Sequence, residues 1–67
     1  MTLPIERTRS LKWTREFLTE LKSDEDLPDR LRRHAEMLLR HYPDDGILHF
    51  TSRFMPDWWG DPSEVKD

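Results

Sequence analysis

The chain has 67 residues, no Cys, 37% charged residues and a formal net charge of −3. A chain this short forms one domain at most, and the lack of Cys excludes disulfides and thiolate metal sites. No apolar run approaches the ~20 residues of a membrane span, and residues 1–10 lack a signal-peptide pattern, so we expect a cytoplasmic protein. Three Trp, three Phe and one Tyr favour a packed structure over disorder.

Residues 3–22 are predicted to form an amphipathic helix with a wide apolar face. Pro4 lies at its start, where a missing N–H costs nothing, and Thr2 is a candidate cap. The residues of this helix that we expect in the core or in a dimer contact are Leu11, Trp13, Phe17, Leu18 and Leu21.

A second helix is predicted from Leu27 to about His41, after an acidic break. Asp26 is its candidate cap, and Pro43 ends it because the residue before a proline avoids the helical region. Leu31, Leu38 and Tyr42 carry its apolar stripe. Two apolar stripes joined by a short connection predict an antiparallel helical hairpin.

Residues 46–55 fit either a short helix or a strand. A strand would alternate Leu48, Phe50 and Phe54 with polar residues, but Ile47 interrupts the alternation and no second strand is available, so we favour the helix. Residues 56–60 are expected to form an aromatic closing turn. The predicted architecture is an all-α domain over 1–60, followed by a flexible acidic tail over 61–67.

The small size of the chain predicts a homodimer. A domain of ~60 residues buries only about 60% of its unfolded surface, and such domains rely on disulfides, metals or oligomerisation. Since disulfides are excluded and no metal pattern is present, we expect a symmetric dimer.

The sequence argues against nucleic-acid, metal and catalytic sites. The cations of the second helix spread around its circumference in an acidic protein, which favours a solvated surface over nucleic-acid binding. His34 and His41 lie seven residues apart, about 10 Å along a helix, too far for one metal ion. The chain has two glycines and no catalytic motif, so no enzyme, cofactor or metal is expected.

The aromatic C-terminal third is the most distinctive feature. Its large residues could all close the hairpin against Trp13 and Phe17, or some of them could contact a partner in addition. The second alternative arises because two adjacent Trp residues cannot both point inward easily. Trp is enriched at binding hot spots. We therefore predict protein-binding residues here and in the acidic break: Trp58, Trp59, Met55, Phe54, Asp24, Glu25 and Asp26.

Three stretches carry a resemblance: residues 4–9 (PIERTR), 14–18 (TREFL) and 38–43 (LLRHYP). Together they resemble a family of very short, functionally unassigned helical proteins from Pseudomonas, Burkholderia and relatives, and the resemblance implies no catalytic or ligand-binding residue. In size, helicity and expected dimerisation the chain is also similar to small phage-encoded anti-activators, which block host transcription regulators.

The sequence thus predicts a non-enzymatic module that masks a basic surface of a protein partner, such as a DNA-binding domain. The alternatives are a nucleic-acid-binding regulator, with a helix-turn-helix-like unit using Arg33, Arg40 and Arg53, and a structural or assembly protein.

Overall fold

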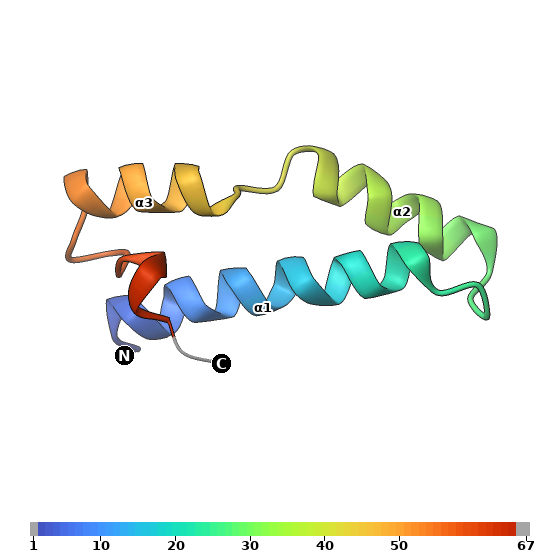
Figure 1. The fold of residues 1–67 in the computed structure, drawn as a ribbon, viewed down its shortest axis with the longest axis horizontal. Helices are drawn as coiled ribbons and strands as arrows, with labels where there is room; N and C mark the ends of the chain where they lie inside the picture. Colours follow the sequence, from blue (N-terminus) through green and yellow to red (C-terminus); the bar gives the residue numbers. More distant parts are fainter. Residues whose placement is uncertain (1, 66–67) are drawn as a thin grey trace. The chain divides into compact units, whose positions relative to one another are not determined.

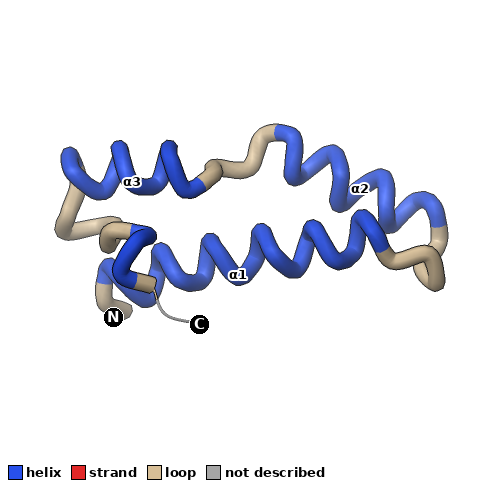
Figure 2. Tube along the Cα trace, viewed as in Figure 1, coloured by secondary structure: helices blue, strands red, loops and turns tan. Residues whose placement is uncertain are grey.

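The computed structural model describes residues 2–65 and is all-helical over that range (Figure 1). It contains α1 (Pro4–Ser23), α2 (Asp29–Arg40), α3 (Asp45–Phe54) and the short 3-10 helix η1 (Pro62–Glu64). Figure 2 separates these helices from the connecting turns. The all-α prediction is confirmed, and the segment 46–55 is helical up to Phe54 rather than extended.

The chain divides into two compact units. The terminal unit comprises Met1–Lys12 and Pro43–Asp67, and the central unit comprises Trp13–Tyr42. The helix α1 contributes its first turns to the terminal unit and the remainder to the central unit.

Helix α1 begins with a reciprocal cap. The Leu3 carbonyl accepts hydrogen bonds from the Glu6 and Arg7 amides at 3.0 and 3.2 Å, and a Glu6 carboxylate oxygen accepts from the Leu3 amide at 3.1 Å. Thr2 therefore does not cap the helix; its carbonyl and hydroxyl oxygens accept from the Arg7 guanidinium instead. Pro4, at the first helical position, needs no partner for an N–H.

Helix α2 begins later than predicted. Its first residue is Asp29, and Pro28 precedes it without any side-chain capping bond. Asp26 is therefore not the cap, and its amide donates to the Asp24 carboxylate at 3.0 Å. Asp29 instead holds the Arg32 guanidinium at 2.7 Å, and the helix ends at Arg40, before Pro43.

A carboxylate decides the start of α3. The Asp44 side chain accepts a hydrogen bond from the Ile47 amide at 2.9 Å, and its carbonyl accepts from Leu48 at 3.0 Å. Such a cap satisfies a donor that the first turn would otherwise leave unpaired, and so favours helix over strand. The helix ends at Phe54, before Pro56.

The terminal unit packs tightly around a threonine. Thr8 is fully buried, and its hydroxyl donates to the Gly60 carbonyl at 2.8 Å. Gly60 approaches α1 so closely that a Cβ atom there would lie 2.7 Å from the Ile5 Cα atom. Leu48, Ser52 and Pro62 are also buried in this unit. The chain after α3 is thus fixed against the first turns of α1.

The central unit buries little apolar surface. Leu18 and Ala35 are its buried apolar residues. The other predicted core or dimer residues of the chain are less covered: Leu11, Leu21 and Tyr42 are half-buried, and Trp13, Phe17, Leu31 and Leu38 are exposed.

The segment predicted as a flexible tail contains regular structure in its described part. Pro62–Glu64 form η1, and the Asp61 carboxylate caps it by accepting from the Ser63 amide at 2.9 Å. Residues 66 and 67 of that predicted tail lie outside the described residues. Over residues 2–65, no helix is both long and apolar enough to cross a lipid bilayer.

Candidate functional site

One side of α3 exposes large apolar side chains. Ile47, Phe50 and Phe54 are 54%, 65% and 71% exposed, and we call these three residues the α3 face. The spacing of three and four residues places them on the same side of the helix. The rings of Phe50 and Phe54 lie 4.8 Å apart at their centroids, tilted by 48°. Arg53 borders the two rings and lines an open hollow of about 380 Å³ with them.

The turn after α3 presents Trp58. Its amide and that of Trp59 both donate to the Met55 carbonyl at 3.0 Å, which closes the predicted aromatic turn. Trp58 is 60% exposed and Met55 is exposed as well, whereas Trp59 is half-buried. Of the two adjacent Trp residues, Trp58 is therefore the one available to a partner.

Arg7 fixes this turn from α1. Its Nε and Nη2 atoms donate to the carbonyls of Trp58 and Asp57 at 2.8 and 3.0 Å. Its guanidinium carbon lies 6.0 Å from the centroid of the Trp58 ring, at the outer limit of a cation–π contact. Trp58 is thus held in a defined position although most of its surface is exposed.

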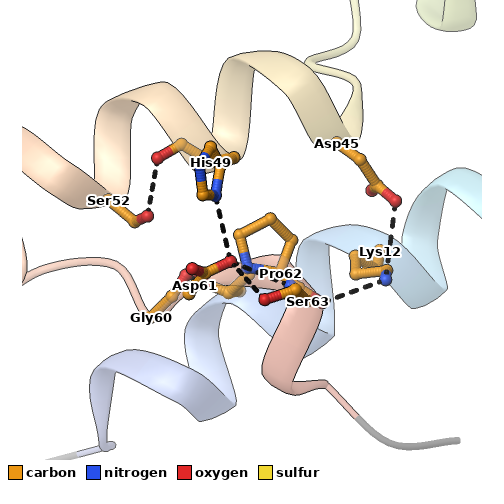
Figure 3. Close-up of polar contacts among 9 residues, drawn as sticks. Lys12, Asp45, His49, Ser52, Gly60, Asp61, Pro62 and Ser63 are labelled. Carbon is orange, nitrogen blue, oxygen red and sulfur yellow. Dashed lines mark hydrogen bonds and ion pairs between the residues drawn. The ribbon is translucent and has the colours of Figure 1, made fainter.

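A second cluster joins α3 to η1 through polar side chains (Figure 3). Asp61 accepts from the Ser63 hydroxyl at 2.9 Å, and its carboxylate lies 3.2 Å from the Nδ1 atom of His49. Lys12 lies 3.6 Å from the Asp45 carboxylate and donates to the Pro62 carbonyl at 3.3 Å. These residues line an open cavity of about 400 Å³.

The geometry of this cluster suits structural support. In a nucleophilic triad the serine donates to an imidazole, and a carboxylate orients that imidazole from its other side. Here Asp61 is the common acceptor for Ser63 and His49, so the serine hydroxyl is directed at the carboxylate rather than at the imidazole. The cluster links η1 to α3 and contributes no activated nucleophile.

Acid should loosen this cluster. The Ser63 amide, followed by the His49 side chain, lowers the pKa of Asp61 below its ordinary value of 3.8. Because the folded pKa lies below the unfolded one, the stabilisation is present above pH 3.8 and is lost as the pH falls through the folded pKa. A carboxyl-carbon NMR titration should place the midpoint of Asp61 below 3.8. A midpoint at or above that value would contradict the cap geometry.

The predicted protein-binding residues are divided between the two units. Asp24, Glu25 and Asp26 are exposed and belong to the central unit, whereas Phe54, Met55, Trp58 and Trp59 belong to the terminal unit. Within residues 2–65, no three His, Asp or Glu side chains gather closely enough to hold a metal ion.

Sequence reasoning missed part of the site. Ile47 and Phe50 belong to the α3 face but were not among the predicted protein-binding residues, although their helical spacing to Phe54 was the signal available. Arg7 and Thr8 gave no such signal, because their partners lie 50 to 52 residues away in the chain.

Comparisons of the chain with protein-family models, with curated proteins and with solved structures found no match.

Proposed function

We propose that the chain is a non-enzymatic binding module of the cytoplasm that covers a surface of another protein with the α3 face, and that Trp58 is a second contact. The α3 face carries the proposal, since three large apolar side chains are each more than half exposed on one side of a capped helix. Contiguous exposed apolar surface marks interaction sites, and buried aromatic side chains supply much of the binding energy at interfaces.

The charge around the α3 face favours a basic partner. Residues 43–65 carry five anions and one cation, which gives a net charge of −4. Asp44 and Asp45 precede the face and Asp57 follows it. A DNA-binding domain of a transcription regulator offers the complementary charge, and covering it would inhibit the regulator as an anti-activator does. Asp24, Glu25 and Asp26 would further increase the association rate through long-range attraction.

A paired substitution tests this proposal. The Phe50→Ala/Phe54→Ala variant should raise the Kd for a protein captured by the wild-type chain from bacterial lysate by about tenfold or more, or about 1.4 kcal/mol. Isothermal titration calorimetry with the captured protein measures the change. Met37→Ala is the matched control, because Met37 is as exposed as Ile47 but belongs to the central unit.

Two results would refute this assignment. If the double variant and the wild type bind the captured protein with equal affinity, the α3 face is not the contact surface. Duplex DNA binding at low salt that falls steeply as salt rises would favour the nucleic-acid alternative. We expect no such binding, because Arg33 and Arg40 each lie 3.8 Å from a carboxylate on their own helix, Asp29 and Glu36 respectively.

We also propose that the central unit is an antiparallel helical hairpin and that the chain forms a symmetric dimer. A hollow of about 150 Å³ supports the hairpin, because it is lined by Leu18 and Leu21 of α1 and by Leu31, Ala35 and Leu38 of α2. The small buried core of this unit supports the dimer, since a single layer of two helices leaves its open apolar side in water.

A further inference from the structure

A hollow in the central unit gathers positive charge from two helices. It has a volume of about 260 Å³ and is lined by Lys22 near the end of α1 and by Asp29, Arg32, Arg33 and Glu36 of α2. We call it the polar hollow. Three of the lining residues are cationic and two are anionic, which gives a net charge of +1. The polar hollow is therefore a positive site in a chain whose net charge is −3.

One hydrogen-bond donor of the lining lacks an acceptor. The Nε atom of Arg32 is buried and has no hydrogen-bond partner within residues 2–65. A buried donor without an acceptor is costly, and in a native protein it points to a water or an ion that belongs beside it. The Arg32 side chain is 33% exposed and lines the polar hollow, so an acceptor that enters the hollow lies next to its guanidinium.

Asp29 fills only half of the edge that this guanidinium offers. Its Oδ1 atom accepts from Nη2 of Arg32 at 2.7 Å, whereas its Oδ2 atom lies 3.8 Å from Nη2 of Arg33. The Nε and Nη2 hydrogens of a guanidinium lie along one edge, which two oxygens of a carboxylate or a phosphate fill together. Because the two oxygens of Asp29 are divided between two arginines, the Nε half of the edge is open to an oxygen of a ligand.

The other charges at the polar hollow are held loosely. The 3.8 Å between Arg33 and Asp29 exceeds hydrogen-bond distance, and the same distance separates Arg40 from Glu36. Lys22 has no ion-pair partner within residues 2–65. Exposed ion pairs of this kind contribute little to stability. A doubly charged anion can therefore attract Lys22 and Arg33 without breaking a strong interaction.

We propose that the polar hollow binds a phosphate dianion, either free or as the monoester of a small metabolite. Arg32 supplies the guanidinium edge, and Lys22 and Arg33 supply the remaining charge. A phosphate monoester carries about −1.5 to −2 charges at pH 7 and has three acceptor oxygens, one for each cation. The volume lies just below the ~300 Å³ of the smallest typical ligand pockets, so a phosphate with a small substituent suits it. This site belongs to the central unit and does not depend on the proposed function of the α3 face.

Binding should be weak and limited to a single phosphate group. Asp24, Glu25 and Asp26 are exposed just before α2, and their charges repel an anion. Asp29 also competes with the ligand for Arg32. We therefore expect a Kd on the order of millimolar. A DNA duplex presents a continuous row of phosphates, so a site for one phosphate does not imply binding to DNA.

NMR titration of the full chain with inorganic phosphate, and separately with glycerol 1-phosphate, tests the site. At constant ionic strength near pH 7, both should shift the Arg32 Nε signal and the amide signals of residues 29–33 in a saturable way. Arg32→Lys keeps the charge but loses the planar edge, and should raise both Kd values by at least about fivefold. Arg15→Lys, an exposed position of α1 outside the polar hollow, should change them by less than about twofold. Circular dichroism checks that both variants keep their helices.

Asp29→Asn distinguishes ligand binding from a structural ion pair. Removal of the competing carboxylate frees the guanidinium edge and should lower the Kd for phosphate by about threefold or more, a gain that a purely structural role of Arg32 would not produce. Asp26→Asn makes the same change of charge outside the polar hollow and should alter the Kd by less than about twofold. Equal effects of the two variants would overturn the proposal, as would the lack of any saturable shift below about 50 mM phosphate. Binding of the captured protein by the α3 face would survive either result.

Discussion

Replacement of Gly60 by alanine should lower the free energy of unfolding by about 1–3 kcal/mol, the usual cost of forcing extra volume into a packed site. The new Cβ atom would lie 2.7 Å from the Cα atom and 2.9 Å from the amide nitrogen of Ile5. Those are backbone atoms of α1, so they cannot rotate away as the end of a side chain would. Relief requires the chain at Gly60 to move off the helix, which breaks its hydrogen bond from Thr8. Urea denaturation followed by Trp fluorescence measures the loss.

The other glycine supplies the control. At Gly46, in the first turn of α3, a Cβ atom would meet only the Asp44 side chain, at 3.3 Å, so Gly46→Ala should leave stability unchanged or raise it by up to about 1 kcal/mol. Equal effects at the two positions would show that the close approach of Gly60 to Ile5 is not formed in solution.

Arg7→Lys should release the turn that carries Trp58 and destabilise the chain by about 2 kcal/mol, because hydrogen bonds from charged groups each contribute about 1.5–3 kcal/mol before solvent exposure is considered. The guanidinium donates to three carbonyls, those of Thr2, Asp57 and Trp58. A lysine ammonium cannot reach three acceptors in that planar arrangement, although it keeps the charge. Urea denaturation should show this loss of unfolding free energy. Iodide should also quench the Trp fluorescence of the variant faster than that of the wild type.

Arg15→Lys serves as the comparison for Arg7→Lys. Arg15 lies on the same helix and is exposed, so the same change there should leave stability within about 0.5 kcal/mol of the wild type. If Arg7→Lys behaves like Arg15→Lys, charge alone holds the turn and the planar hydrogen bonds do not.

The helices could be predicted because their boundaries depend on nearby residues. The helix predicted over 3–22 is observed over 4–23, and Pro4 and Pro43 lie at predicted ends that the structure confirms. The start of α2 was predicted less well. Asp26 was the candidate cap, but α2 begins at Asp29, and the Asp26 amide donates to the Asp24 carboxylate. Local signals therefore fixed the type of each element better than its first residue.

The packing of the terminal unit could not be predicted in the same way. Thr8 interrupts the apolar pattern of α1, and nothing near it in the sequence indicates that a carbonyl 52 residues away would satisfy its hydroxyl. The aromatic turn contacts Arg7 and Thr8 and lies against Ile5, and no local pattern in the sequence singles out these three positions as its partners. Helical spacing likewise identifies the α3 face but cannot tell whether the rest of the fold covers it.

The composition of the terminal unit has a consequence for synthesis on the ribosome. Thr8 needs the carbonyl of Gly60, so the segment 1–12 must wait until residue 60 has been made before this unit can close. At ~5–20 residues per second that delay lasts several seconds, whereas the residues of the central unit are contiguous and are all made before Gly60. During the delay the nascent amino-terminal turns of α1 remain available to chaperones and proteases, and premature termination before Gly60 would leave them without their closing segment.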